Sequence, residues 1–372
     1  MSKLFKYAFS DLYDISSGIS STKDQAGHGT PFASFRTVFN NIFLPDKLPD
    51  LMEVSEKEKK IYSIKKGDIL ITRTSETVDE LAMSCVALKD YPQATYSGFV
   101  KRLRPKTEGI VYDRFMAFFL RSKYFRKVIE CNTIMTLRAS FNEDIFSFLD
   151  LYLPDYETQK RIGDLLYHME RKRENNAQIN DNLQQMAHMT FMHCFWGKPT
   201  NGTIGEILIE HEKSPIQVGQ AKNTVGSYPF FTSGDAVLRW KSSLIDGRNI
   251  FMNTGGNAGV KFYVGKAAYS TDTWCVSARD GLSDYLYLFL DSIKPELSQK
   301  FFQGTGLKHL QKPILKNRPM YIPSKDELEV FNHSVIPWLT LVSDNIRESE
   351  RLAALRDWLL PMLMNGQATI ED

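Results

Sequence analysis

The sequence has few of the features that mark secreted or membrane-bound proteins. Four cysteines occur in 372 residues, no two of them form a CxxC pair, and they are widely spaced: Cys85, Cys131, Cys194 and Cys275. This pattern argues against a disulfide framework and favours a reducing compartment. No apolar run approaches the roughly 18 residues of a membrane span, and the N-terminal segment is too polar for a signal peptide. We therefore expect a cytoplasmic protein that makes no contact with a membrane.

Charge of one sign is not in excess either. The chain carries 46 Lys and Arg against 44 Asp and Glu, a net charge of +2. This balance neither requires nor excludes nucleic acid, because a DNA-binding surface can be basic while the rest of the chain is acidic. The composition is 42% hydrophobic and 24% charged, which is ordinary for a globular protein, and the length predicts two domains.

Catalytic motifs are also scarce. There is no GxxxxGK[ST] phosphate loop and no GxSxG nucleophile turn. The glycine-rich "NTGGNAG" (253–259) lacks the phosphate-loop lysine, so we interpret it as a turn. His188 and His193 are five residues apart and would not share one face of a helix as metal ligands do. We therefore predict a chain that binds and does not catalyse.

The chain contains an internal repeat. "LYLP" (151–154) and "MYIP" (320–323) each join a short apolar strand to a helix-like segment, and they lie 169 positions apart. Upstream, "KKGDILIT" (65–72) resembles "DGRNIFMNT" (246–254), and "TYSGFV" (95–100) lies where "AYSTDT" (268–273) lies in the second copy. Several matches in the same order predict two copies of one structural unit.

Each copy ends in a long helical pattern. We expect an α+β (mixed) fold with two pseudo-repeated α/β domains, and the predicted ranges are 1–155 for the first domain, 156–198 for a proximal helix, 199–324 for the second domain and 325–372 for a distal helix and tail. The helices themselves are predicted at 157–196 and 326–365, each about 60 Å long at 1.5 Å per residue. Pro337 falls inside the second helix and is expected to kink it.

A helix this long with a single apolar stripe needs a partner. The two helices either pair with each other as a coiled coil that separates the domains, or each lies on its own domain. The residues predicted to pair the helices recur at the repeat offset: Ile162, Leu166, Met169 and Leu183 in the first, and Phe331, Val335, Trp338 and Leu352 in the second. Asn176 and Asn345 interrupt both stripes, as polar residues that set the helix register or as residues that face solvent.

Polar loops after the strands supply candidate DNA contacts. Arg and Lys can bind phosphates or guanine edges, Asn can bind adenine, and Ser and Thr can do either. The candidates are Ser21, Thr22, Lys23, Arg36, Arg73, Thr74, Arg138 and Ser140 in the first copy, and Lys222, Arg239, Lys241, Asn253, Lys308 and His309 in the second. The basic stretches 101–106 and 121–127 are either a phosphate-contacting face or an ordinary solvated surface.

Segments throughout the chain resemble one family. "ERLAALRDWLLPMLMNGQATI" (350–370) and "LPDYETQKRIGDLL" (153–166) are similar to the distal and proximal helices of the DNA specificity subunit of type I restriction-modification systems. "KKGDILIT", "TPFASFRTVFNN" and "YSTDT" resemble positions in the target recognition domains of that family. The second helix departs from the pattern, because "IPSKDELEVFNHSVIPWL" lacks the Gln-Lys-Arg start and adds a proline.

The resemblance implies a DNA-recognition subunit without catalytic activity. Two target recognition domains would each recognise one half of a bipartite site in double-stranded DNA. Two long antiparallel coiled-coil helices would separate the domains and dock two modification (methyltransferase) subunits. The resemblance places the cofactors in the partners and none in this chain: S-adenosylmethionine in the modification subunits, and ATP and Mg in the complex that forms when restriction (motor-nuclease) subunits join.

Two other functions stay open at this point. In the first, the chain is a helical adaptor or scaffold that binds proteins rather than DNA. In the second, it is a nuclease built on Asp50, Glu58 and Lys60, which imitate a carboxylate–lysine pattern inside a solvated charge run.

Overall fold

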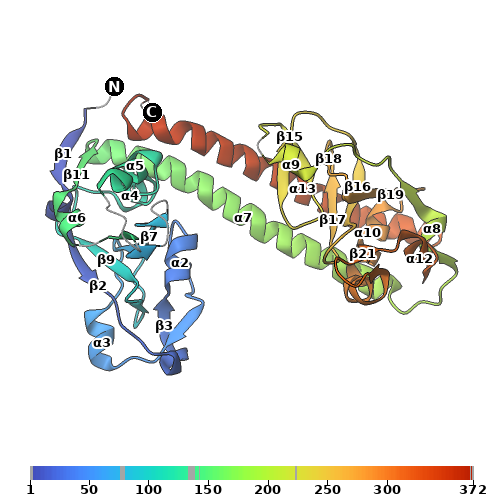
Figure 1. Ribbon diagram of the computed structural model, residues 1–372, viewed down its shortest axis with the longest axis horizontal. Coiled ribbons are helices and arrows are strands. Elements are labelled where there is room, and N and C mark those ends of the chain that lie inside the picture. Colours follow the sequence, from blue (N-terminus) through green and yellow to red (C-terminus); the bar gives the residue numbers. More distant parts are fainter. Residues whose placement is uncertain are drawn as a thin grey trace. The chain divides into compact units, whose positions relative to one another are not determined.

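The computed structural model describes residues 3–75, 80–132, 139–141, 143–222, 224–368 and 370, and leaves the side chains of Ser75, Ala139 and Ser140 undescribed. The chain divides into two compact units. Unit 1 comprises Met1–Lys172 with Arg351–Asp372, and unit 2 comprises Arg173–Glu350. Each unit thus contains one globular part and a portion of both long helices, whose labels can be followed in Figure 1.

Unit 1 is built from short sheets and helices. A four-stranded sheet has the order β2 (Tyr13–Ser17), β9 (Val100–Pro105), β5 (Ile69–Thr72), β7 (Ser84–Val86). A three-stranded sheet has the order β4 (Asp50–Met52), β3 (Ala26–Ala33), β8 (Thr95–Tyr96), and two pairs join β1 (Phe5–Ala8) to β11 (Asp150–Leu153) and β6 (Thr74–Ser75) to β10 (Ala139–Ser140). The short helices are α1 (Phe9–Leu12), η1 (Lys23–Gln25), α2 (Phe35–Asn40), α3 (Glu56–Ile61), α4 (Asp113–Phe119), α5 (Lys123–Asn132) and α6 (Glu143–Phe148).

Unit 2 repeats this arrangement. Its four-stranded sheet has the order β13 (Leu208–Glu210), β19 (Thr273–Ala278), β16 (Arg248–Asn253), β17 (Val260–Val264). The order in its three-stranded sheet is β15 (Val237–Trp240), β14 (Tyr228–Phe231), β18 (Ala268–Tyr269), and the pairs are β12 (Gly202–Thr203) with β22 (Pro319–Met320) and β20 (Phe302–Gln303) with β21 (His309–Leu310). The short helices are α8 (Ile204–Ile207), α9 (Val218–Ala221), α10 (Ser283–Ser292), α11 (Lys294–Glu296), the π-helix η3 (Leu297–Phe301) and α12 (Lys312–Lys316).

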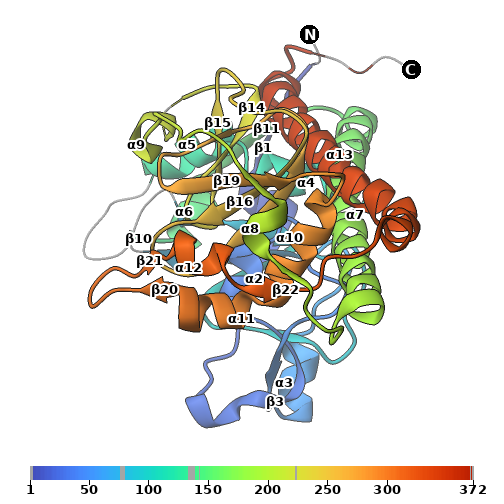
Figure 2. The same ribbon diagram turned by 90° about the vertical axis from the view of Figure 1, so that its right-hand side faces the viewer.

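The shared strand order confirms the predicted repeat. β5 and β16 lie inside their four-stranded sheets, and they fall within the matched segments 65–72 and 246–254. The parallel pairing of β3 with β8 recurs as β14 with β18, which places Tyr96 and Tyr269 at equivalent positions. Figure 2 shows β16 beside β19 with α10 next to them, and α10 contacts both strands.

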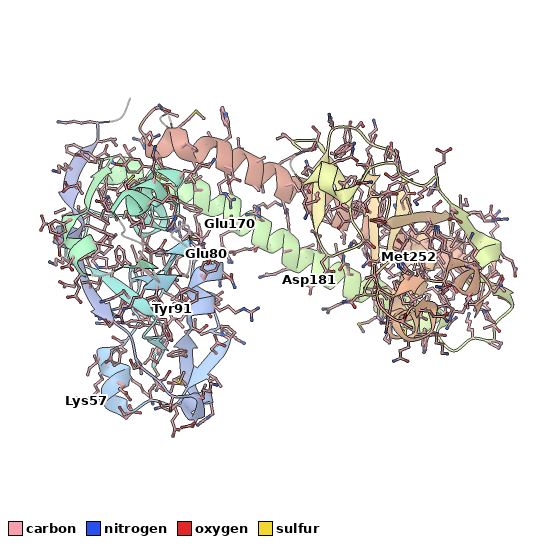
Figure 3. The ribbon with its side chains drawn as sticks, viewed as in Figure 1. Lys57, Glu80, Tyr91, Glu170, Asp181 and Met252 are labelled. Carbon is pink, nitrogen blue, oxygen red and sulfur yellow. The ribbon has the colours of Figure 1, made fainter. Side chains whose placement is uncertain are left out.

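Each unit has its own large apolar core. In unit 1, α4 supplies Phe115 and Phe119, which are fully buried together with Phe9 of α1. In unit 2, Tyr285 of α10 belongs to one core cluster with Met252 of β16, which Figure 3 labels. Because apolar burial is the main favourable term in folding, each unit has the material for a stable core.

The two long helices are α7 (Tyr156–Phe195) and α13 (Lys325–Met364), each within one residue of the predicted bounds. α7 begins after Asp155, whose carboxylate accepts from the backbone N–H of Thr158 (3.0 Å), and this bond holds the pKa of Asp155 below its ordinary value. α13 begins with a reciprocal pair in which Glu327 N–H donates to Ser324 Oγ and Ser324 N–H donates to Glu327 Oε2. This capping box replaces the expected Gln-Lys-Arg start. α13 continues through Pro337 as one helix, so this proline does not end it.

The residues predicted to pair the helices belong to the cores of their own units. Ile162 and Leu166 are buried in the unit 1 core, where Leu363 of α13 joins them. Phe331 and Val335 are buried in the unit 2 core, where Phe195 of α7 joins them. Within each unit the helices therefore run antiparallel and pack on each other and on the globular part. Met169 and Trp338 border these cores, whereas Leu183 and Leu352 are half-buried.

Asn176 and Asn345 join the two helices inside unit 2. Their exposed fractions are 1% and 8%, so the solvent-facing alternative is wrong. Asn176 Nδ2 donates to Ser349 Oγ (3.3 Å) and Glu348 Oε2 (2.7 Å). Asn345 Nδ2 donates to Asn180 Oδ1 (2.9 Å), and position 349 is position 180 moved by the repeat offset. The two asparagines thus make reciprocal contacts between the two helices. Such buried polar contacts favour one register of a helix pair.

Gly163 allows α7 to approach α4 closely. A Cβ added there would lie 2.6 Å from the backbone nitrogen of Phe115, a contact that only a backbone shift can relieve. We expect Gly163→Ala to lower the free energy of unfolding by about 1–3 kcal/mol, measured by urea titration of the full chain. The control Gly219→Ala, where an added Cβ meets nothing within 4 Å, should leave stability unchanged or slightly raised. Equal destabilisation by both substitutions would contradict the close-packing argument.

Candidate nucleic-acid interface

Four polypeptide segments adjoin on one side of unit 1. The N–H of Gly98 donates to the carbonyl of Ile19 (2.7 Å), and the N–H of Arg73 donates to the carbonyl of Phe99 (2.9 Å). The N–H of Phe141 donates in turn to the carbonyl of Arg73 (2.8 Å), next to the pairing of β6 with β10. We call residues 19–23, 97–99, 73–75 and 139–141 the unit 1 loop surface. Hydrogen bonds between the segments hold its backbone in a fixed frame.

This surface brings several predicted residues together. Arg73 is exposed, and its side chain makes no hydrogen bond or ion pair with any residue that the structure describes. Thr74 lies opposite Ser140 in the register of β6 and β10. Of the remaining residues predicted in the first copy, Ser21, Thr22 and Lys23 are exposed on the same surface, and Arg36 is exposed on α2. Arg138 lies outside the described residues.

An equivalent surface exists in unit 2. The N–H of Thr254 donates to the carbonyl of Asp272 (3.2 Å), and the N–H of Leu310 donates to the carbonyl of Thr254 (3.0 Å). The loop is closed by a bond from the N–H of Gly256 to the carbonyl of Lys308 (2.9 Å). We call residues 271–272, 254–256 and 307–310 the unit 2 loop surface. Lys308 and His309 are exposed on it, as the sequence predicted for DNA contacts.

Two predicted residues of unit 2 are committed to internal contacts. Asn253 is 5% exposed, and its Nδ2 donates to the carbonyl of Asn257 (3.0 Å). Its side chain therefore stabilises the glycine-rich turn. Arg239 forms an ion pair with Glu350 of α13 (2.6 Å) and donates to the carbonyl of Gly226. The exposed residues Lys222 and Lys241 lie after α9 and after β15, respectively.

Several cations of the basic stretches 101–106 and 121–127 make contacts inside unit 1. Lys101 and Arg102 lie in β9 inside the four-stranded sheet and are 5% and 9% exposed. The neighbouring Arg104 makes two hydrogen bonds to Asp68 (2.6 and 2.7 Å), and Arg121 donates to backbone carbonyls that include those of Ser84 (2.6 Å) and Asn41 (2.7 Å). These four cations therefore have structural roles within the fold.

The nuclease-like residues have local structural roles. Asp50 lies in β4 and accepts a hydrogen bond from Thr37 (3.3 Å). Glu58 forms a capping box with Ser55 at the start of α3, and the Ser55 hydroxyl and N–H lower its pKa. Within the described ranges, no group of three or more His, Cys, Asp or Glu side chains is arranged to hold a metal ion. The same ranges contain no helix with the length and apolar character of a membrane span.

Phe99 and Asp272 were not predicted from the sequence. Phe99 is 63% exposed on the unit 1 loop surface, directly beside Arg73. Asp272 is exposed at the equivalent position of the unit 2 loop surface. The aligned segments "TYSGFV" and "AYSTDT" place both residues three positions after the matched tyrosines. That alignment could have identified them, because both are last before a buried strand.

Exposed apolar side chains occur in matched pairs on the two long helices. On α7, in unit 2, Met186 and Met189 are 45% and 69% exposed. On α13, in unit 1, Leu355 and Trp358 are 42% and 64% exposed. The two pairs are related by the repeat offset of 169 residues. A spacing of three residues places both members of a pair on the same helix face, so each helix presents one equivalent apolar patch.

Comparison with known proteins matches this organisation. The model of the type I restriction modification DNA specificity domain matches residues 6–185 and 196–334. The HindI specificity subunit of a type I restriction enzyme from Haemophilus influenzae is 30% identical over 189 residues, which cover 50% of this chain and 39% of that subunit. The MjaIX specificity subunit from Methanocaldococcus jannaschii is 21% identical over 369 residues, covering 87% of this chain and 82% of that one. The crystal structure of the S subunit of a type I system from M. genitalium shares the fold, with a TM-score of 0.69 and 13% identity over 97% of this chain and 96% of that one.

Proposed function

Because the chain belongs to the family of type I restriction modification DNA specificity domains, we propose that unit 1 and unit 2 each recognise one half of a bipartite DNA target. The observation that carries this proposal is the repeated loop surface. Both units use the same backbone hydrogen bonds to present side chains, and the side chains differ between the units. A common frame with different side chains suits the recognition of two different half-sites.

We also propose that the long helices dock two modification subunits. The matched apolar pairs, Met186 with Met189 and Leu355 with Trp358, are what two copies of one partner require. A duplicated patch offers the same contact twice, once on each helix. Methyl transfer from S-adenosylmethionine would occur in those partners, and ATP- and Mg-dependent cleavage would follow when restriction subunits join. In this proposal the chain itself catalyses no reaction, acts in the cytoplasm and selects the sequence.

Methylome sequencing tests the proposal directly. We expect cells that carry this chain with its modification subunit to show methylated adenines in a bipartite motif with a fixed unrecognised spacer. Cells that carry the modification subunit alone should lack that motif. An assembled complex that methylates no defined motif would contradict the proposal.

Salt dependence separates the proposal from the adaptor alternative. If the assembled complex makes 6–10 phosphate contacts, DNA affinity should fall by roughly 10³- to 10⁵-fold between 50 and 200 mM salt. Fluorescence anisotropy with a duplex containing the methylated motif would measure this slope, and a scrambled duplex provides the control. A protein adaptor that binds through apolar surface would bind its partner with little change over this range, and it would not distinguish the two duplexes.

A further inference from the structure

Three residues on the loop surfaces have the chemistry of base recognition. We infer that Arg73 selects a guanine and Phe99 a thymine methyl group in the half-site of unit 1, and that Asp272 selects an exocyclic base amino group in the half-site of unit 2. This inference rests on the proposed function and deepens it, since it assigns base chemistry to named positions. The amino group can belong to cytosine or adenine in the major groove.

The repeat establishes which positions correspond. Arg73 donates its N–H to the carbonyl of Phe99, and Thr254 donates its N–H to the carbonyl of Asp272. The carbonyls of Arg73 and Thr254 accept from the N–H groups of Phe141 and Leu310, which are separated by the repeat offset of 169 residues. Asp272 therefore occupies the place of Phe99, and Thr254 occupies the place of Arg73. The two surfaces present different chemistry at the same points of one frame.

Arg73 and Asp272 differ from some other charged residues of their units in being available. Arg104 and Arg239 are held in ion pairs with Asp68 and Glu350, at 2.6 Å in both cases. By contrast, the side chains of Arg73 and Asp272 are exposed, and neither makes an ion pair or hydrogen bond with any residue in the described ranges. An unpaired guanidinium can donate two hydrogen bonds to O6 and N7 of guanine.

Asp272 is the most discriminating of the three residues. A carboxylate is repelled by phosphates and can only accept hydrogen bonds, so the group on DNA that it can contact favourably is a donor on a base. The neighbouring Lys308 and His309 are exposed on the same surface and can contact the phosphates around it. A cavity of about 250 Å³ lined by Thr254, Asp272 and Trp274, among others, lies beside the carboxylate.

Phe99 is held outward by its own backbone. Its N–H donates to Ser97 Oγ (3.2 Å), and its carbonyl accepts from the N–H of Arg73 (2.9 Å). Phe99 is 63% exposed, so its apolar surface stays in contact with water unless a partner covers it. Beside a guanine-binding arginine, the apolar group in the major groove that fits it is the 5-methyl group of thymine.

The first experiment changes base preference. We propose methylome sequencing of cells in which the full complex carries Arg73→Gln or Asp272→Asn. Gln and Asn both pair with adenine, so Arg73→Gln should replace one guanine by adenine in the first half-site, with discrimination changing by about 5- to 140-fold. Asp272→Asn should alter one position of the second half-site only. The controls Lys57→Gln and Asp280→Asn make the same charge changes at exposed positions that belong to neither surface, and Figure 3 labels Lys57.

The second experiment removes only the methyl group. Binding of the wild-type complex should weaken when deoxyuridine replaces thymine in the first half-site, and binding of the Phe99→Ser complex should not respond to that replacement. Equal responses of both complexes would remove Phe99 from base recognition.

The outcomes separate this inference from the function on which it rests. If the wild-type complex methylates a bipartite motif and both charge variants keep it, the inference is wrong while the function holds. If Arg73→Gln weakens binding to every sequence and reduces the salt slope by about one, Arg73 is a phosphate anchor. If the wild-type complex methylates no motif, the proposed function itself fails.

Arg73→Lys, which keeps the charge but loses the planar fork, should relax the guanine preference without loss of folding, as checked by thermal melting.

Discussion

Replacing Arg248 with methionine is expected to lower the free energy of unfolding by about 3–5 kcal/mol, because it leaves a buried carboxylate without its cation. Arg248 begins β16, and its guanidinium donates two hydrogen bonds to Asp284 of α10. It also donates to Thr340 Oγ1 of α13 (2.8 Å). The Asp284 side chain is 1% exposed. One arginine therefore ties a central strand to a core helix and a long helix, all within unit 2.

The loss should depend on pH. Burial raises the pKa of Asp284 above its ordinary value even though Arg248 opposes that shift. A carboxyl whose folded-state pKa is raised is most favourable to folding below its unfolded pKa, and stability is lost as pH rises towards the folded-state value. Removing the arginine raises the pKa further, so Arg248→Met should be destabilised more at pH 8 than at pH 5. Urea titrations of the full chain at both pH values would measure the difference.

A double variant provides the control for this prediction. Arg248→Met combined with Asp284→Leu removes the carboxylate together with its partner, so it should recover much of the lost stability and abolish the pH dependence. If the single variant were as stable as the wild type at pH 8, or if the double variant were no better than the single one, the buried ion pair would not be responsible.

The repeat and the helices could be predicted because they depend on spacing. A fixed offset of 169 residues and an apolar period of three to four residues are visible in one sequence. The predicted helix bounds differ from α7 and α13 by one residue at each end. The positions of Asn176 and Asn345 in the stripes were likewise visible, but their partners were not, because those lie on the other helix.

The candidate interface was predicted less well, for a physical reason. Whether a cation is available for DNA depends on partners that are far away in sequence, such as Glu350 for Arg239 and Asp68 for Arg104. Charged residue types in loops gave Arg73, Lys308 and His309, which are exposed on the loop surfaces. Phe99 carries no charge and gives no signal of its own. Only its place in the repeated frame distinguishes it from a core phenylalanine.

Aspartate at either apolar helix patch is expected to remove one modification subunit from the complex. Met189→Asp places a charge in the patch on α7, and Trp358→Asp does the same in the patch on α13. Both side chains are large and more than 60% exposed, at 69% and 64%. Such apolar anchors often contribute 2 kcal/mol or more to an interface, which corresponds to at least about a 30-fold loss of affinity. Native mass spectrometry of the assembled complex should show one bound modification subunit for each single variant and none for the double variant.

The matched control is Leu341→Asp on α13. Leu341 is 44% exposed, but its counterpart at the repeat offset is Lys172, so it belongs to no repeated patch and should leave both subunits bound. None of these substitutions lies on a loop surface. If the loop surfaces bind DNA without docked partners, the helix variants should therefore keep their sequence-specific DNA affinity. If either single variant lost both modification subunits, or if the double variant kept both, docking would not follow the repeat. The loss of one subunit from each single variant is the result that only two equivalent and independent docking sites produce.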